Sequence, residues 1–223
     1  MIDHSKIKLE KIPVPGSHGS VKYNDHRIIY EGEVCPYLEM TGPVTKQHLG
    51  YEQMKNDLII CSNLILYLAD NYKNNPFISN AVWESIIVKY GRCFVSASEG
   101  RGLKLEKSKV FDTASNNIKN MHKHIMNERN NFAAHAGNSD SDVISSRLAV
   151  MPPKIGKELV MIYSSRDFVI SPEDATIGEI QSLIDHVIKH IDSKLDKIFQ
   201  KLKDEYVSKD INEIYDNANY IIA

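Results

Sequence analysis

The sequence predicts a mainly α protein, an antiparallel bundle of four to five helices with a small β hairpin or sheet insertion. Long segments repeat apolar residues at spacings of three and four, which is the period of a helix that packs on one side. The stretch 146–170 changes to short runs of β-forming residues. Because no repeat or low-complexity tract divides the chain, we expect residues 1–223 to form a single domain.

The N-terminal region, 1–43, is expected to be irregular, because prolines and glycines interrupt it. Residues 21–23 and 27–30 are rich in β-forming side chains. They flank the polar residues 24–26, which are typical of a turn. We therefore expect a short hairpin whose turn lies at 24–26.

Two helices are predicted next, over about 44–73 and 79–98. The apolar stripe of the first consists of Tyr51, Met54, Leu58, Cys61, Ile65, Leu68 and Tyr72. The apolar stripe of the second consists of Val82, Ile86, Tyr90, Cys93 and Ala97. A short basic connector follows, with Arg101, Lys104, Lys107 and Lys109.

A third helix is predicted from 112 or 113 to about 137, and the longest helix over about 176–206. The stripe of the long helix consists of Ile177, Ile180, Ile184, Val187, Ile191, Leu195, Ile198 and Leu202. At about 1.5 Å per residue this helix spans about 45 Å, more than the other helices can cover. The excess could pack on a second subunit. The tail, 207–223, is expected to be a weaker helix.

Between the third helix and the long helix the sequence predicts two strands, at 147–151 and 159–163, joined by a turn rich in proline and glycine. Residues 167–170 are a candidate third strand. The two strands could pair with each other or with the N-terminal strands, and either arrangement gives a small sheet.

The bulk composition excludes several classes of protein. A net charge of −2 does not indicate a strongly basic nucleic-acid binder, although a local basic patch is compatible with it. Cys35, Cys61 and Cys93 fit neither a disulfide framework nor a metal-ligand spacing. The N-terminus lacks the apolar core of a signal peptide, and the longest apolar run is too short to span a membrane. We expect a cytoplasmic protein.

The segment 128–137 concentrates groups suited to phosphate chemistry. Arg129 offers a fork of donors for phosphate oxygens, and His135 has a pKa suited to proton transfer near neutral pH. Asn130 can orient either group. Arg129 and His135 are six residues apart, which on an ideal helix is about 120° around the axis and about 9 Å along it. The two side chains therefore do not stack on one face, and they converge only if the helix kinks or if the site faces a groove.

This pattern resembles the HEPN superfamily, whose members carry an arginine, usually a polar residue, and then a histidine after four to six intervening residues. Here Arg129 and Asn130 precede His135, and the ending Ala134-His135-Ala136-Gly137 is also similar. The resemblance implies an endoribonuclease that needs no metal or other cofactor and leaves a 2′,3′-cyclic phosphate. His135 would act as general base or acid, Arg129 would bind the scissile phosphate and Asn130 would assist.

The resemblance also implies partners. The substrate would be RNA, and the enzyme would act as a homodimer with two motifs facing each other across the subunit interface. Such proteins often serve as toxins or as abortive-infection effectors in antiviral defence, sometimes beside an antitoxin or other defence-system partner protein. Ala136-Gly137-Asn138 departs from the aromatic or acidic residues that follow the histidine in many members, which leaves the subfamily open.

Three further residues are candidates for RNA or phosphate binding. Asn131 lies four residues before His135, so the two share a helix face. Arg92 and Arg101 could line the same groove as the motif, because the second and third helices are expected to be neighbours.

Other interpretations stay open. Arg129 could be a surface arginine and His135 a helix-end histidine that interacts favourably with the helix dipole. The chain would then be a non-catalytic helical module that binds nucleotides, RNA or a protein. His186 and His190 have a metal-compatible spacing without a recognisable third ligand, so we predict no metal site. His122 and His124, with Lys119 and Lys123, make the third helix locally basic.

Overall fold

The computed structural model describes residues 3–15, 21–71, 75–95, 102–134, 142–156, 158–168 and 174–219. In these residues the chain is mainly helical with small antiparallel sheets, which confirms the predicted fold class at this level. It packs as two compact units, one of Met1–Lys46 with Phe199–Ala223, and one of Gln47–Ile198. The single-domain expectation stays a prediction.

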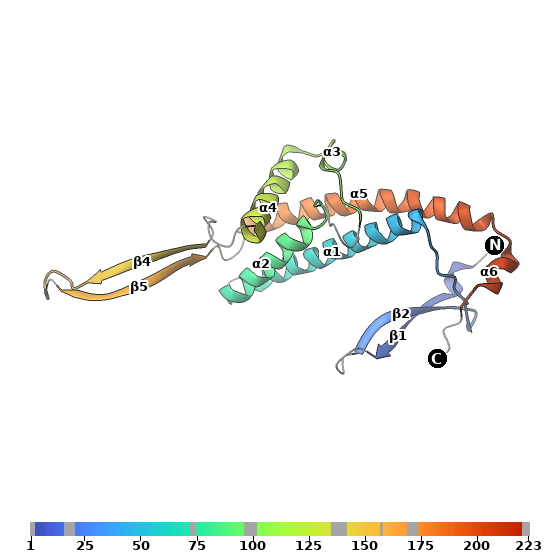
Figure 1. Ribbon diagram of the computed structural model, residues 1–223, viewed down its shortest axis with the longest axis horizontal. Coiled ribbons are helices and arrows are strands. Elements are labelled where there is room, and N and C mark those ends of the chain that lie inside the picture. The colour runs from blue at the N-terminus through green and yellow to red at the C-terminus, as the bar shows by residue number, and fades with distance from the viewer. Residues whose placement is uncertain are drawn as a thin grey trace. The chain divides into compact units, whose positions relative to one another are not determined.

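The two longest helices, α1 (Pro43–Asn71) and α5 (Asp174–Val207), lie side by side and antiparallel (Figure 1). Lys55 Nζ lies 2.7 Å from Asp192 Oδ1. Further along α1, Ser62 Oγ lies 3.2 Å from Gln181 Oε1. Later residues of α1 therefore contact earlier residues of α5, as antiparallel helices require. Both helices were predicted within three residues of their observed ends.

Helix α2 spans Pro76–Gly91 and begins earlier than the predicted residue 79. Asn75 is its N-cap, and its side-chain oxygen accepts the backbone N–H groups of Phe77 and Ile78 at 3.1 and 3.3 Å. The prediction began α2 at 79, although a proline directly after an N-cap is favourable in the first helical turn.

Helix α2 also ends earlier than the predicted residue 98. Its last residue is Gly91, and the chain then turns, with the Phe94 N–H donating to the Gly91 carbonyl at 3.0 Å. Helix α2 runs antiparallel to α1, because Asp57 lies 3.5 Å from Lys89 while Cys61, one turn later, contacts the carbonyl of Ile86. Ala97 and the rest of 96–101 lie outside the described residues.

A short helix, α3 (Lys107–Val110), and the longer α4 (Asn116–Ala134) follow. Helix α4 begins three to four residues later than predicted. The chain first makes a turn closed by the Ala114 N–H and the Phe111 carbonyl, and Ser115 Oγ then accepts the N–H of Ile118. The predicted end near 137 lies outside the described residues.

The buried core of Gln47–Ile198 draws on α1, α2, α4, α5 and the segment between α2 and α4. All eight residues of the stripe predicted for the long helix are buried. Hydrophobic periodicity therefore located the packing face of α5 correctly.

The N-terminal sheet consists of β1 (Ile7–Pro15), β2 (Val21–Tyr30) and β3 (Glu33–Val34), in that order. The predicted turn at 24–26 is wrong, because these residues continue β2, and Asp25 and His26 pair with β1. The tight turn lies at Glu31 and Gly32 instead. Both have positive φ, 53° and 93°, as a two-residue hairpin turn between twisted strands requires.

The second sheet is a two-stranded hairpin, β4 (Asp142–Val150) and β5 (Leu159–Phe168). The predicted strands pair with each other and not with the N-terminal strands. A separate third strand at 167–170 is wrong for its described part, because Asp167 belongs to β5 and pairs with Val143. We call this element the β4–β5 hairpin.

The C-terminal tail contains a short helix, α6 (Ile211–Asp216), whose N-cap Asp210 accepts the N–H of Asn212. Asn219 then pairs with Tyr37 through two backbone hydrogen bonds of 2.7 and 2.9 Å. Among the described residues, no helix is both long and apolar enough to cross a membrane.

Candidate functional site

The motif arginine lies on α4 where this helix contacts the last residue of α2. A Cβ atom added to Gly91 would lie 2.9 Å from Arg129 Cγ and 3.2 Å from its Cδ. The aliphatic part of Arg129 therefore occupies the space that any larger residue at 91 would need. This close approach fixes the stem of Arg129 beside the C-terminal end of α2.

The guanidinium of Arg129 reaches its neighbour in the motif. Its Nη1 donates to Asn130 Oδ1 at 3.1 Å. Among the described residues no carboxylate pairs with Arg129, and one hydrogen bond leaves most of its donors for another acceptor. The predicted residues Arg129 and Asn130 are thus brought together.

The other predicted site residues are placed only in part. His135 and Arg101 lie outside the described residues, so the distance between Arg129 and His135 stays untested. Asn131 belongs to α4, but its side chain is outside the described set. Arg92 is exposed and directly follows Gly91, so its backbone lies at the α2 end that Arg129 contacts.

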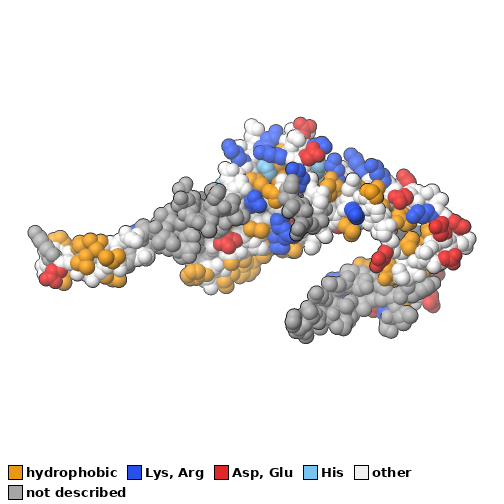
Figure 2. Space-filling view, viewed as in Figure 1, with side chains coloured by type: hydrophobic (Ala, Val, Ile, Leu, Met, Phe, Trp, Pro, Cys, Tyr) orange, Lys and Arg blue, Asp and Glu red, His pale blue; other side chains and the backbone are white. Residues whose placement is uncertain are grey.

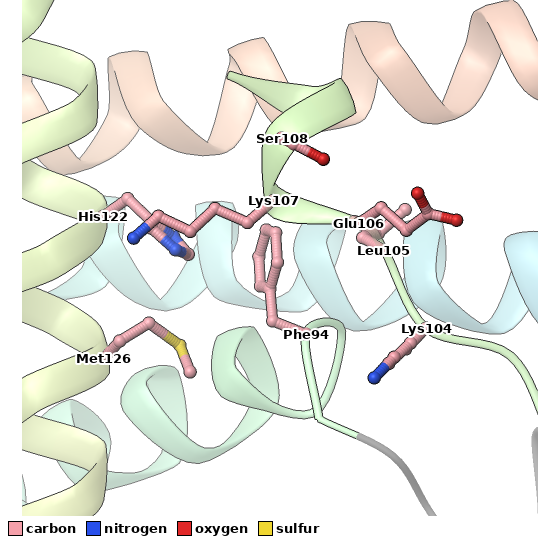
Figure 3. A pocket seen from close by; sticks show the side chains of 8 residues that line it. All are labelled: Phe94, Lys104, Leu105, Glu106, Lys107, Ser108, His122 and Met126. Carbon is pink, nitrogen blue, oxygen red and sulfur yellow. The ribbon is translucent and has the colours of Figure 1, made fainter. Parts of the chain in front are cut away.

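A pocket of about 470 Å³ opens beside α4 (Figure 3). Its apolar and ring-bearing lining consists of Phe94, Leu105, His122 and Met126. Its polar lining consists of Lys104, Glu106, Lys107 and Ser108. We call these eight residues the α4 pocket. Figure 2 shows Lys and Arg side chains gathered over the α3 and α4 part of the face on view.

His122 forms a buried wall of the α4 pocket and is held by Tyr90. Its Nδ1 lies 2.8 Å from the Tyr90 hydroxyl oxygen, and only 3% of the residue is exposed. Burial, and then the nearby Lys107 ammonium, lower the pKa of His122 to about 4. Burial also raises the pKa of Tyr90. At neutral pH an uncharged imidazole can therefore accept the Tyr90 proton at Nδ1 and carry its own proton on Nε2.

Aromatic rings surround His122 on two sides. Its ring centroid lies 4.6 Å from that of Phe94 and 4.4 Å from that of Phe111. Phe94 and Phe111 are themselves stacked at 5.8 Å, and Phe94 lies 5.2 Å from Tyr90. The two ring-bearing residues of the pocket lining, Phe94 and His122, are therefore packed into a larger cluster of flat side chains.

The pocket and the motif arginine share one face of α4. Met126 is four residues after His122, and Arg129 is seven residues after it. Seven residues are within about 20° of two full turns, and they advance about 10 Å along the helix. Because Tyr90 contacts His122 and Gly91 contacts Arg129, this face is the one turned toward the end of α2.

The sequence singled out some residues of the pocket but did not show that they would lie together. Lys104 and Lys107 were part of the predicted basic connector, and His122 was part of the locally basic helix. Nothing in their spacing showed that Phe94 and Phe111 would enclose His122 or that its pKa would fall. His124, by contrast, is exposed.

The structure gives His186 a hydrogen-bonding role. Its Nε2 donates to the Val110 carbonyl at 2.9 Å, and its ring stacks on Phe111 at 5.8 Å. Within the described ranges, no group of three or more His, Cys, Asp or Glu residues could hold a metal ion.

Comparisons of this chain with protein-family models, curated proteins and solved structures found no match.

Proposed function

We propose that this chain is a metal-independent endoribonuclease of the HEPN type, built on a HEPN-like helical bundle. The observation that carries the proposal is the motif on α4. Its arginine and its polar residue are hydrogen-bonded at 3.1 Å, and the arginine has no carboxylate partner among the described residues. A guanidinium without a carboxylate partner is suited to bind phosphate oxygens.

The proposed reaction is an internal transesterification. One His135 imidazole takes the proton of a ribose 2′-hydroxyl, and the oxygen forms a bond to phosphorus. Arg129 binds the non-bridging oxygens as negative charge increases on them, and Asn130 orients the guanidinium. The bond from phosphorus to the 5′-oxygen breaks, and this oxygen receives a proton from a protonated imidazole. The products are a 2′,3′-cyclic phosphate and a 5′-hydroxyl.

A homodimer would supply the second imidazole. It would also let Arg129 of one chain meet His135 of the other, although the two residues of one chain are about 120° apart on an ideal helix. Helix α5 has 34 residues and spans about 50 Å. The proposal is that part of its length packs on a second copy, so that Arg129 of one chain serves His135 of the other. We place this enzyme in toxin or antiphage defence systems, where a partner protein would restrain it.

The first test is cleavage of a mixed RNA pool by the purified protein in excess EDTA, with analysis of the product ends. Wild type should leave cyclic phosphates. His135→Ala should reduce the rate by about 10²–10⁴-fold, and Arg129→Ala by about 10²–10³-fold. His124→Ala is the matched control, because His124 is an exposed histidine of α4 outside the motif. Equal rates for all four proteins would remove the motif from the mechanism.

A second test addresses the shared site. Heterodimers of one Arg129→Ala chain and one His135→Ala chain can be purified with two different tags. If the two groups act across the interface, one intact pair of Arg129 and His135 forms, and cleavage rises above that of either homodimeric variant, with the proton transfer of the missing imidazole left to water. If both groups act within one chain, neither site is complete and the heterodimer is inactive. The second result would contradict the trans arrangement while leaving the motif in place.

A second candidate function is a non-catalytic helical binding module. The packing of Arg129 against Gly91 favours it, because it gives the arginine a structural reason to be present. A cation near the C-terminal end of α2 is also favourable for that helix. In this case expression would not be toxic, and His135→Ala would change neither growth nor RNA integrity.

A further inference from the structure

We propose that the α4 pocket is a binding site for a nucleoside phosphate, with the base against the aromatic wall and the phosphate at Lys104 or Lys107, whose side chains extend to different sides of the Phe94 ring (Figure 3). The site is made of residues other than the Arg129, Asn130 and His135 motif, and the proposal does not rest on ribonuclease activity. The ligand is either a free nucleotide or one nucleotide of an RNA strand, because both present the same base and phosphate.

The shape of the pocket suits a small planar ligand. Its volume of about 470 Å³ lies in the range of small-molecule sites. Figure 3 shows the Phe94 ring in the middle of the lining, between Lys107 on α3 and Met126 on α4. An aromatic ring and a thioether both make favourable contacts with the face of a base.

The wall is preorganised for stacking. The Tyr90 hydroxyl fixes the His122 ring through Nδ1 at 2.8 Å, and Phe111 lies 4.4 Å behind it. His122 is uncharged near neutral pH, because burial lowers its pKa to about 4. It therefore supports the Phe94 ring from behind and adds no positive charge to the site. The cationic groups of the site are the two lysines.

The rim supplies charge and hydrogen bonds for the rest of a nucleotide. Lys104 and Lys107 are exposed, and the hydroxyl of Ser108 can donate to a phosphate oxygen. Glu106 also lines the pocket, and its carboxylate lies 2.8 Å from Lys109 Nζ. This pairing offsets its repulsion of a phosphate, and its remaining lone pairs can accept hydrogen bonds from a sugar hydroxyl or a base amino group. A bare polyanion would use none of these acceptors.

The test is binding measured by calorimetry in EDTA, with three probes: adenosine monophosphate, inorganic phosphate and a short 2′-O-methyl oligoadenylate. The last probe lacks the 2′-hydroxyl, so it cannot be cleaved by the proposed reaction. The double variant Lys104→Gln/Lys107→Gln should weaken binding of the mononucleotide or the oligonucleotide at least tenfold. The matched control is Lys119→Gln/Lys123→Gln, which removes the same charge from exposed positions of α4 outside the pocket.

A second readout uses the methyl groups of methionine by NMR. The Met126 signal should shift when the ligand binds to wild type, while that of Met151, in the linker between β4 and β5, should not. This measurement needs no variant and holds even if a lysine substitution disturbs folding.

The outcomes separate the sources and decide the proposal. Binding of the mononucleotide with a Met126 shift identifies a free nucleotide site. Binding of the oligonucleotide alone, with the same shift and the same lysine dependence, identifies a nucleotide within a strand. The proposal is overturned if inorganic phosphate binds as well as the mononucleotide, if both double variants weaken binding equally, or if no probe moves Met126. None of these results depends on His135, so failure of the ribonuclease proposal would be seen separately.

Discussion

The helices of Gln47–Ile198 bury their apolar side chains, whereas the β4–β5 hairpin leaves its described large apolar side chains exposed. In α5 the stripe residues Ile180, Ile184, Val187 and Ile191 are fully buried. In the hairpin the described large apolar residues are more than half exposed: Leu148 56%, Val150 63%, Leu159 59%, Val160 54%, Met161 52% and Ile162 70%. The two strands are richer in apolar residues than α5, so composition does not explain the difference.

The difference lies in what each element can pack against. A helix buries its stripe when other helices lie on it, and α5 has such neighbours from Ile177 to Leu195. A two-stranded sheet satisfies its inner backbone groups but covers neither face. The hairpin is therefore specified by its backbone ladder and its turn, while the bundle is specified by its core. Replacing single residues in each region separates these two sources of stability.

The largest effect is expected for Ile184→Ala in the centre of α5. The side chain is fully buried, so the substitution removes apolar contacts and leaves a cavity. We expect the free energy of unfolding to fall by about 2–5 kcal/mol, measured by urea denaturation. A loss below about 1 kcal/mol would mean that the bundle core relaxes freely and that the comparison with the hairpin fails.

The next effect concerns the contact between α2 and α4. Gly91→Ala places a Cβ 2.9 Å from Arg129 Cγ, and we expect a net loss of about 1 kcal/mol, because overpacking outweighs the better helix propensity of alanine. In the Arg129→Ala background the obstacle is gone, and Gly91→Ala should become stabilising by up to about 1 kcal/mol. Denaturation of all four proteins gives the coupling energy directly.

Gly178→Ala on α5 is the control for this cycle, because an added Cβ there meets no atom within 4 Å. It should stabilise the protein by up to about 1 kcal/mol in either background. If Gly91→Ala behaved like Gly178→Ala in the wild-type chain, the stem of Arg129 would not be fixed against α2, and the placement of the motif arginine would need revision.

A third prediction concerns pH. The pKa of His122 is lowered from 6.5 to about 4, so the folded state favours the neutral ring. Its contribution is complete above pH 6.5 and is lost as the pH falls from 6.5 to about 4, because only the unfolded state binds the proton in that window. After allowance for solvent screening, we expect His122 to account for no more than about 2 kcal/mol of the loss.

The measurement is the urea midpoint of wild type and His122→Asn between pH 7.5 and pH 4. The amide can still accept the Tyr90 hydroxyl proton but does not titrate. The pKa of His190 is also lowered by burial, so some loss remains in the variant, and the difference between the two curves isolates His122. Identical slopes would show that His122 is not held neutral in the fold.

The sequence predicted correctly those helices whose apolar residues follow one regular spacing. All eight predicted stripe residues of α5 are buried, because a 3.6-residue period specifies one face whatever packs on it. The start of α2 was missed, since Asn75 can both end one helix and cap the next. The turn at 24–26 was also wrong, since pairing with β1 overrides the turn preference of Asp25.

The candidate site shows the same limit. The motif identified Arg129 and Asn130, which are neighbours in sequence, and the structure joins their side chains. The α4 pocket gathers Phe94, Lys107 and His122 from three separate segments. No spacing rule connects such residues, because their proximity arises from how α2 and α4 cross. Burial and pKa are properties of that crossing and not of the local sequence.

The smallest effect is expected for Ile162→Ala in β5, which makes the same chemical change as Ile184→Ala. Ile162 is 70% exposed and faces Leu148 across the ladder. In the monomer we expect a loss below about 0.5 kcal/mol, because little apolar surface returns to water. A loss above 2 kcal/mol that grows with protein concentration would mean that a second copy covers the hairpin in solution. The difference in burial between α5 and the hairpin would then exist only in the isolated chain. In the dimer, the apolar residues of the hairpin would be buried against the second copy.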